Sequence, residues 1–145
     1  MGCDIHAHIE VKMNDEWVHY SALTCLDRDY MFFGIIAGVR CYEEQKFEVR
    51  GFPEDATKIT KMDYDLWGED AHTHSWLKGD EVVEAIKLLG DKRRLEDLDR
   101  HQYADFLLNY EIRMNSVFGY NLNDFEYLNS KFGITDTRLV FWFDS

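Results

Sequence analysis

The chain begins with an alternating stretch, Gly2-Cys3-Asp4-Ile5-His6-Ala7-His8-Ile9-Glu10-Val11-Lys12. Its apolar residues fall at every second position, which is the period of a β-strand that buries one face. Asn14 and Asp15 follow as a turn signal, and residues 17–20 resume a strand pattern. We therefore expect a β-hairpin at the start of the chain.

A second stretch rich in β-forming residues lies near the other end: Arg138-Leu139-Val140-Phe141-Trp142-Phe143. This composition predicts a central strand that is buried on both faces. Between the two stretches, helical spacing predicts a helix over 30–37, capped by Asp27 and ended by Gly38. Two further helices are predicted over 80–90, which starts with an aspartate cap, and over 93–118.

The pattern is irregular over 40–67, which we interpret as a functional loop region with a short strand over 46–50 and a turn at 51–53. Strands at both termini with helices between them predict an α+β fold. We expect a single globular domain over residues 1–145, with a mixed or antiparallel sheet that includes both chain termini and about three helices.

Composition limits the classes of partner. The chain has 145 residues, 46% of them hydrophobic, which is enough for a real core. Its formal charge of −12 opposes binding to bulk double-stranded DNA, although a small nucleotide can still bind in a local basic pocket. Three cysteines without metal-binding spacing, and no long apolar run, predict a cytoplasmic protein that does not enter a membrane.

Two segments share the pattern Asp-x-His-x-His, and one of them lies in the opening stretch. In an extended strand each segment aims one carboxylate and two imidazoles to the same side. If the segments meet, they form a site for a divalent metal such as zinc or manganese. The candidate metal ligands are Asp4, His6, His8, Asp70, His72 and His74.

The same residues are suited to acid–base chemistry. His6 and His72, with Asp4 and Asp70, are the candidate catalytic residues, either around a metal or as a metal-free general acid and base. The second segment follows Gly68, so we expect it in a loop that leads into the next helix. The simpler alternative is that the first segment faces water and the second satisfies the backbone of a turn.

Three arginines are candidate phosphate ligands, because arginine binds phosphate through two parallel hydrogen bonds. They are Arg28, Arg40 and Arg50. The alternative for each is an internal ion pair, such as Arg50 with Glu48 or Glu54. Trp76 is a candidate for stacking on a base, along with other aromatic residues that the core could equally require.

Several motifs resemble those of an uncharacterised family of small phage and prophage proteins. They are the opening Met1-Gly2-Cys3-Asp4-Ile5-His6, Arg28-Asp29-Tyr30, Ala37-Gly38-Val39-Arg40, the Arg-Gly-x-Pro turn at 50–53, and the terminal Arg-x-Val-Phe-x-Phe-Asp at 138–144. The family also has an Asp-Gly-His-Ser loop, from which this chain departs at Ala71 and Thr73. His8 and His74 lie outside the family's motifs. The resemblance implies a phage origin and a host-cytoplasm setting, where small proteins act on nucleotides or counter host defences.

Two functions from different classes remain open. The first is a hydrolase or lyase that acts on a phosphate ester, a nucleotide or small nucleic acid, through His6, His72, Asp4 and Asp70. The second is a non-catalytic counter-defence protein that sequesters a nucleotide signal or inhibits a host protein. An enzyme needs His6 and His72 at one reacting atom, whereas a nucleotide-sequestering protein needs a pocket of aromatic and basic residues.

Overall fold

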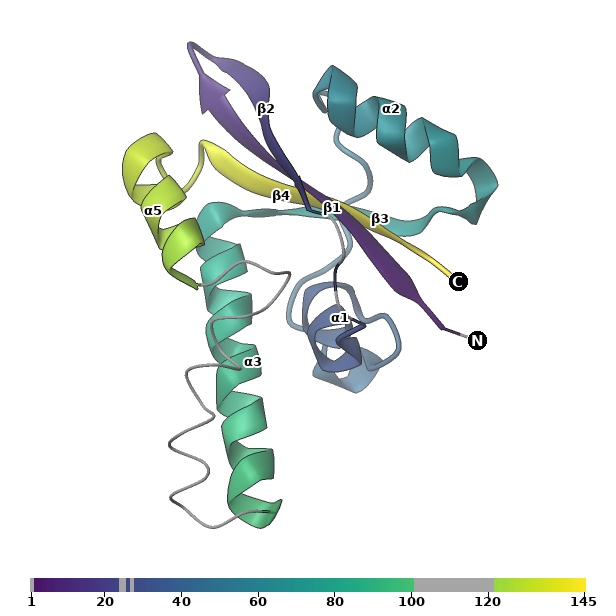
Figure 1. Cartoon of the computed structure of the whole chain (residues 1–145), viewed down its shortest axis with the longest axis vertical. Coiled ribbons are helices and arrows are strands. Elements are labelled where there is room, and N and C mark those ends of the chain that lie inside the picture. The colour runs from purple at the N-terminus through teal and green to yellow at the C-terminus, as the bar shows by residue number, and fades with distance from the viewer. Residues whose placement is uncertain (1, 24–25, 27, 101–121) are drawn as a thin grey trace.

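Four strands form one antiparallel sheet in the computed structural model, which describes residues 2–23, 26, 28–100 and 122–145. They are β1 (Asp4–Met13), β2 (Glu16–Leu23), β3 (His72–Lys78) and β4 (Thr137–Asp144), and their order across the sheet is β2-β1-β4-β3. The terminal strands β1 and β4 are central neighbours, with Asp4 paired to Asp144, so the two ends of the chain emerge together (Figure 1). The expected α+β fold, with an antiparallel sheet that includes both chain termini, is confirmed.

The two faces of the sheet carry different layers. Helices α1 (Tyr30–Ala37), α3 (Gly79–Arg100) and α5 (Leu122–Phe132) lie on one side of the sheet, and α2 (Lys58–Trp67) lies on the other (Figure 1). The first face is apolar. Its fully buried residues include Ile9, Phe32, Phe33, Ile35, Ile36, Leu77, Ile86, Leu89, Phe125, Leu139, Phe141 and Phe143. Burial of such side chains stabilises the fold by roughly 1.5–3 kcal/mol each.

The face beneath α2 carries polar residues, some of them buried. Glu10 and Arg138 pair across β1 and β4, with 0% and 4% of their side chains exposed. One oxygen of the Glu10 carboxylate accepts hydrogen bonds from Arg138. The other accepts from the Thr57 backbone N–H and the Thr60 hydroxyl, both at 2.8 Å. Because Thr57 is the N-cap of α2, this carboxylate fixes the start of that helix on the sheet.

Both edge strands contain a β-bulge. The pairing of β2 with β1 shifts by one residue at Tyr20, so His19 lies opposite Glu10. The pairing of β3 with β4 shifts in the same way near Thr73, so Ser75 pairs with Phe141 and Trp76 with Val140. An extra residue reverses which side chains face each side of a strand. The bulges therefore turn Trp17 and His19, and on the other edge Trp76 and Lys78, to the α2 face.

Several predicted elements need correction. No strand forms over 46–50, and the irregular 40–67 region contains a 3-10 turn (Tyr42–Glu44) and the whole of α2. The loop predicted around the second Asp-x-His-x-His segment is the edge strand β3, preceded by a 3-10 turn (Gly68–Asp70). Gly90 does not end a helix, because α3 continues to Arg100 without a break.

Other helix predictions are close. The N-cap of α1 is Asp29, whose carboxylate accepts from the Phe32 N–H, and Gly38 ends the helix in the left-handed conformation as predicted. Asp27 and most of the predicted 93–118 helix lie outside the described residues, and α5 was not predicted. The described helices include none that is both long and apolar enough to cross a bilayer.

The Glu10–Arg138 pair gives a direct test of the α2 face. We expect Glu10→Gln to lower the free energy of unfolding by about 3–5 kcal/mol, because it removes the buried counter-charge of the guanidinium and leaves only the exposed Asp55 carboxylate to compensate it. The matched control is Asp65→Asn, which breaks the exposed Lys61–Asp65 pair of α2 and should cost at most about 1 kcal/mol. Urea unfolding followed by circular dichroism measures both. Equal effects would show that the buried pair is not a structural anchor.

The bulge in β3 gives a second test. Thr73 has a φ of 52°, which strains a β-branched residue. Relief of this strain should exceed the entropic cost of a glycine, so Thr73→Gly should stabilise the protein by about 1 kcal/mol and raise the melting temperature by a few degrees. Thr73→Val keeps the branched side chain and should not stabilise. A lower melting temperature for the glycine variant would contradict the strained bulge.

Candidate functional site

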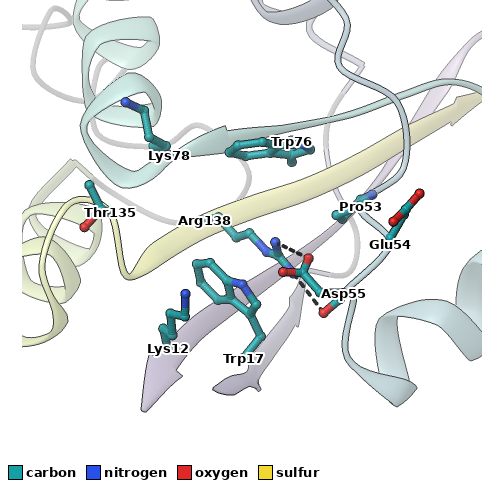
Figure 2. Close-up of a pocket in the computed structure, with 9 residues that line it drawn as sticks. All are labelled: Lys12, Trp17, Pro53, Glu54, Asp55, Trp76, Lys78, Thr135 and Arg138. Carbon is teal, nitrogen blue, oxygen red and sulfur yellow. Dashed lines mark hydrogen bonds and ion pairs between the residues drawn. The ribbon is translucent and has the colours of Figure 1, made fainter. Parts of the chain in front are cut away.

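A pocket of about 530 Å³ opens on the α2 face, between the two bulged edge strands (Figure 2). Trp17 from β2 and Trp76 from β3 stand on its opposite sides, and Arg138 from β4 lies between them. The volume is in the range of small-ligand sites. The full lining is Lys12, Trp17, Pro53, Glu54, Asp55, Trp76, Lys78, Thr135 and Arg138.

Arg138 forms the floor of the pocket, and its hydrogen bonds are already used. Its guanidinium donates to Glu10 at 2.8 Å and to the Asp55 carboxylate at 2.9 Å. The same group lies 3.9 Å from the centre of the Trp17 ring, in cation–π contact. Arg138 therefore fixes the position of Trp17 and of the 53–55 segment, and is not itself a free anion ligand.

Trp76, on the opposite side of the pocket, packs against a second arginine, Arg50. The Arg50 guanidinium lies 4.7 Å from the centre of the Trp76 ring and forms two hydrogen bonds to Glu81, at 2.7 and 2.6 Å. Arg50 does not line the pocket. The Arg50 guanidinium thus packs against the Trp76 indole, which itself lines the pocket.

Two lysines of the pocket form no salt bridge with a described residue, although the charge of Lys78 contributes to lowering the pKa of Glu81. In the part of the chain that the structure describes, neither Lys12 nor Lys78 forms an ion pair. Most other described cations do, as Lys61 does with Asp65. The Lys12 Nζ lies 5.5 Å from the centre of the Trp17 ring. In a chain of net charge −12, two unpaired ammonium groups beside tryptophans form a local site for an anion.

Two carboxyl groups beside the pocket, Asp55 and Glu81, have lowered pKa values. Burial alone would raise the pKa of Asp55, but the hydrogen bond and the charge of Arg138 outweigh it, and the pKa of this carboxyl is lowered. Burial likewise opposes ionisation of Glu81, and hydrogen bonds from Arg50 and the Lys78 backbone N–H lower its pKa. These carboxylates therefore stay charged and keep both arginines in place at neutral pH.

A hydrogen-bonded network of polar side chains lies under α2, beside the pocket. His8 is almost fully buried, and its Nε2 is 2.7 Å from Asp63 Oδ2. Its Nδ1 is 2.9 Å from His19 Nε2, so both ring nitrogens are hydrogen-bonded. Burial and the neighbouring His8 lower the pKa of His19. This network links α2 to β1 and β2.

His6 belongs to a separate pair on the same face. Its Nε2 lies 2.5 Å from Asp144 Oδ2, and its ring lies 4.0 Å from that of Trp67 at the end of α2. His6, Asp63 and Trp67 line a smaller cleft of about 340 Å³, whose other walls are apolar. None of the residues that line this cleft is a lysine or an arginine.

The two Asp-x-His-x-His segments do not form one site. Strand β4 lies between them, and His6 pairs with Trp142 whereas His72 pairs with Phe143. Because consecutive residues of β4 face opposite sides of the sheet, His6 and His72 do as well. Among the described residues, no three histidine, cysteine or acidic side chains group together as metal ligands.

The remaining members of the segments have other partners. Asp4 forms a salt bridge with Arg28, and the hydrogen bond from Arg28 lowers the pKa of that carboxyl. His72 contacts Thr73 and Ser145, and His74 lies 3.0 Å from the Tyr64 hydroxyl. Asp70 is exposed at the end of a 3-10 turn.

The three candidate phosphate ligands also lie apart. Arg28 binds Asp4, Arg40 lies 5.4 Å from the centre of the Tyr30 ring, and Arg50 binds Glu81. The structure thus gives each a partner within the protein. Trp76, the candidate stacking residue, is the one predicted substrate ligand that lines the pocket.

Comparison with protein-family models, with curated proteins and with solved structures found no match for this chain.

Sequence reasoning missed most of the pocket: Lys12, Trp17, Glu54, Lys78 and Arg138. A weak signal was present, since Lys12 and Trp17 flank the hairpin turn and Lys78 follows Trp76 by two residues, which is the spacing of one strand face. What joins these residues is the order of the strands, which the sequence does not display.

The pKa of His19 predicts a pH dependence. A histidine whose pKa is lowered in the folded state binds its proton more readily in the unfolded chain, so stability falls as pH decreases through about 6.5 and below. Thermal unfolding from about pH 7.5 to about pH 5.5 should therefore show a loss of stability that His19→Gln reduces. An identical pH profile for the variant would contradict this role of His19.

Proposed function

We propose that this protein binds and sequesters a small nucleotide in the pocket between Trp17 and Trp76, without catalysis. The observation that carries the proposal is the combination of two tryptophans with two unpaired lysines in one pocket of about 530 Å³. A nucleotide offers an aromatic ring and an anionic phosphate within one small molecule, and the pocket offers a complement for each.

Trp76 supplies the stacking surface, and Trp17 forms the opposite wall of the pocket. An indole face that a base covers contributes about 1–3 kcal/mol of binding free energy. Trp76 is held in place by Arg50, and Trp17 is held by Arg138. Because both rings are fixed before a ligand arrives, little conformational entropy is lost on binding.

The charges favour a small anion over a polymer. Lys12 and Lys78 attract a phosphate, whereas the net charge of −12 repels a long polyanion. No histidine lines the pocket, and its two acids are Glu54 and Asp55, of which Asp55 is bound to Arg138. This composition supports binding more than phosphate-ester cleavage.

The setting follows from the resemblance to small phage and prophage proteins. A phage protein that holds a nucleotide in the cytoplasm of an infected cell would remove it from the host's signalling or defence systems. The proposal therefore predicts stoichiometric binding and no turnover.

Removal of one stacking wall tests this function. Isothermal titration calorimetry with AMP, GMP, CMP and UMP should detect one site per chain for at least one of them. Trp76→Leu keeps an apolar side chain but loses the stacking surface, so the dissociation constant should rise by about 5- to 150-fold. The matched control is Tyr42→Leu, which removes an exposed aromatic ring that does not line the pocket.

Two outcomes of this experiment would contradict the proposal. No heat of binding with any of the four nucleotides, for a protein with a cooperative thermal transition, would overturn the proposal. Equal weakening by Trp76→Leu and Tyr42→Leu would show that the loss is unrelated to the pocket.

A phosphate-ester hydrolase or lyase is the second candidate, and the two histidine–carboxylate pairs favour it. His6, which pairs with Asp144, and Asp63, which pairs with His8, both line the cleft of about 340 Å³, where the two could act as acid and base. The absence of a cation from the lining of this cleft makes it the weaker proposal for a phosphate ester. Phosphorus NMR of each nucleotide after long incubation separates the two functions, because a sequestering protein returns its ligand unchanged.

A further inference from the structure

We infer that the pocket selects guanine nucleotides, with the phosphate at the Lys12–Lys78 end and the base edge at Glu54. This inference rests on the proposed function and deepens it. It comes from the uneven distribution of charge along the pocket, which gives a bound nucleotide a direction.

The cationic end is set by the strand topology. Strand β1 ends at Met13, β3 ends at Lys78 and β4 begins at Thr137, so all three termini lie at one end of the sheet. Lys12 and Lys78 stand there, together with Thr135 just before β4, as Figure 2 shows. Two ammonium groups and a hydroxyl form the part of the pocket that suits a phosphate.

The acidic end is formed by the segment that leads into α2. Figure 2 shows Pro53, Glu54 and Asp55 on the side of the pocket away from the lysines, with the tryptophans between. The Asp55 carboxylate already binds Arg138. Glu54 has no hydrogen-bond or ion-pair partner among the described residues, so its carboxylate is free to accept from a ligand.

The two ends of the pocket favour one orientation of a bound nucleotide. Its phosphate and the pairing edge of its base lie at opposite ends of the molecule, with the ribose between them. When the phosphate lies at the lysines and the base at the tryptophans, the pairing edge points toward Glu54.

A carboxylate at that edge distinguishes the bases. Guanine presents two adjacent donors there, the N1–H and the exocyclic amino group, and these match the two oxygens of a carboxylate. Adenine and cytosine present one amino group beside a ring nitrogen that is an acceptor, and uracil presents one N–H between two carbonyl oxygens. Only guanine avoids placing an acceptor against the carboxylate.

Calorimetry with GMP, AMP, guanosine and inorganic phosphate tests the inference on the intact protein. GMP should bind at least about tenfold more tightly than AMP, which is the usual discrimination of one good bidentate contact. Glu54→Gln should reduce this preference to about threefold or less, because the amide offers one acceptor in place of two. Lys12→Ala combined with Lys78→Ala should weaken GMP binding to the level of guanosine.

Matched controls keep the result specific. Glu69→Gln and Lys131→Ala remove exposed charges that do not line the pocket and should leave both affinities unchanged. Thermal unfolding of each variant checks that it is folded. Glu54 and both lysines are solvent-accessible enough that their loss should not unfold the protein.

The outcomes separate this inference from the proposed function. Tight binding of all nucleotides, with no preference for guanine or with a preference that Glu54→Gln preserves, would overturn the inference and leave the nucleotide-binding function intact. Binding of guanosine as tightly as GMP would overturn the role of the lysines. No binding of any nucleotide would overturn the proposed function itself.

Discussion

The polar half of this structure depends on the buried ion pair between Glu10 and Arg138. Each charge is removed from water, and each is compensated by several partners at once. The carboxylate binds the start of α2 through Thr57 and Thr60, and the guanidinium binds Asp55 and lies over Trp17. A single pair thus positions the helix that covers the second face of the sheet, the 53–55 segment and one wall of the pocket. The buried pair is less a source of net stability than a device that fixes one arrangement of these parts.

The pocket and the hydrogen-bonded network of His8, His19 and Asp63 share residues on the same face of β1. His8, Glu10 and Lys12 are alternate residues of β1, so the first binds α2 through Asp63, the second anchors its start, and the third lines the pocket. A change in the contact of α2 with the sheet would therefore also move the segment that carries Glu54. The site is held by the sheet on one side and by the start of α2 on the other.

The parts of the fold that sequence reasoning predicted are those with a strong local signal. The alternation of residues 2–12, the hairpin turn and the apolar run at 138–143 each specify an element by their own period, and the structure contains all three. Helix α2 was missed because its outward face carries Ile59, Met62 and Leu66, all largely exposed, so the usual apolar stripe does not mark its buried side. Strand β3 was missed because the bulge at Thr73 breaks its alternation. Trp76 and Lys78 reach the pocket only through that break, so no pattern of period two could have grouped them with Trp17.

The pairing of the first strand with the last has a consequence for how the molecule is made. Glu10 and Arg138 are separated by 128 positions along the chain, and β1 gains its neighbour β4 only after all the residues between them have been synthesised. Until then β1 can pair with β2 alone, and a two-stranded hairpin is at best marginally stable in water. Contacts of such high sequence separation slow folding, because the entropy of closing a long loop is lost before the sheet forms. The nascent chain therefore carries an unpaired glutamate and an open edge of β1 until β4 has been made, and the sheet closes only when β4 enters its centre.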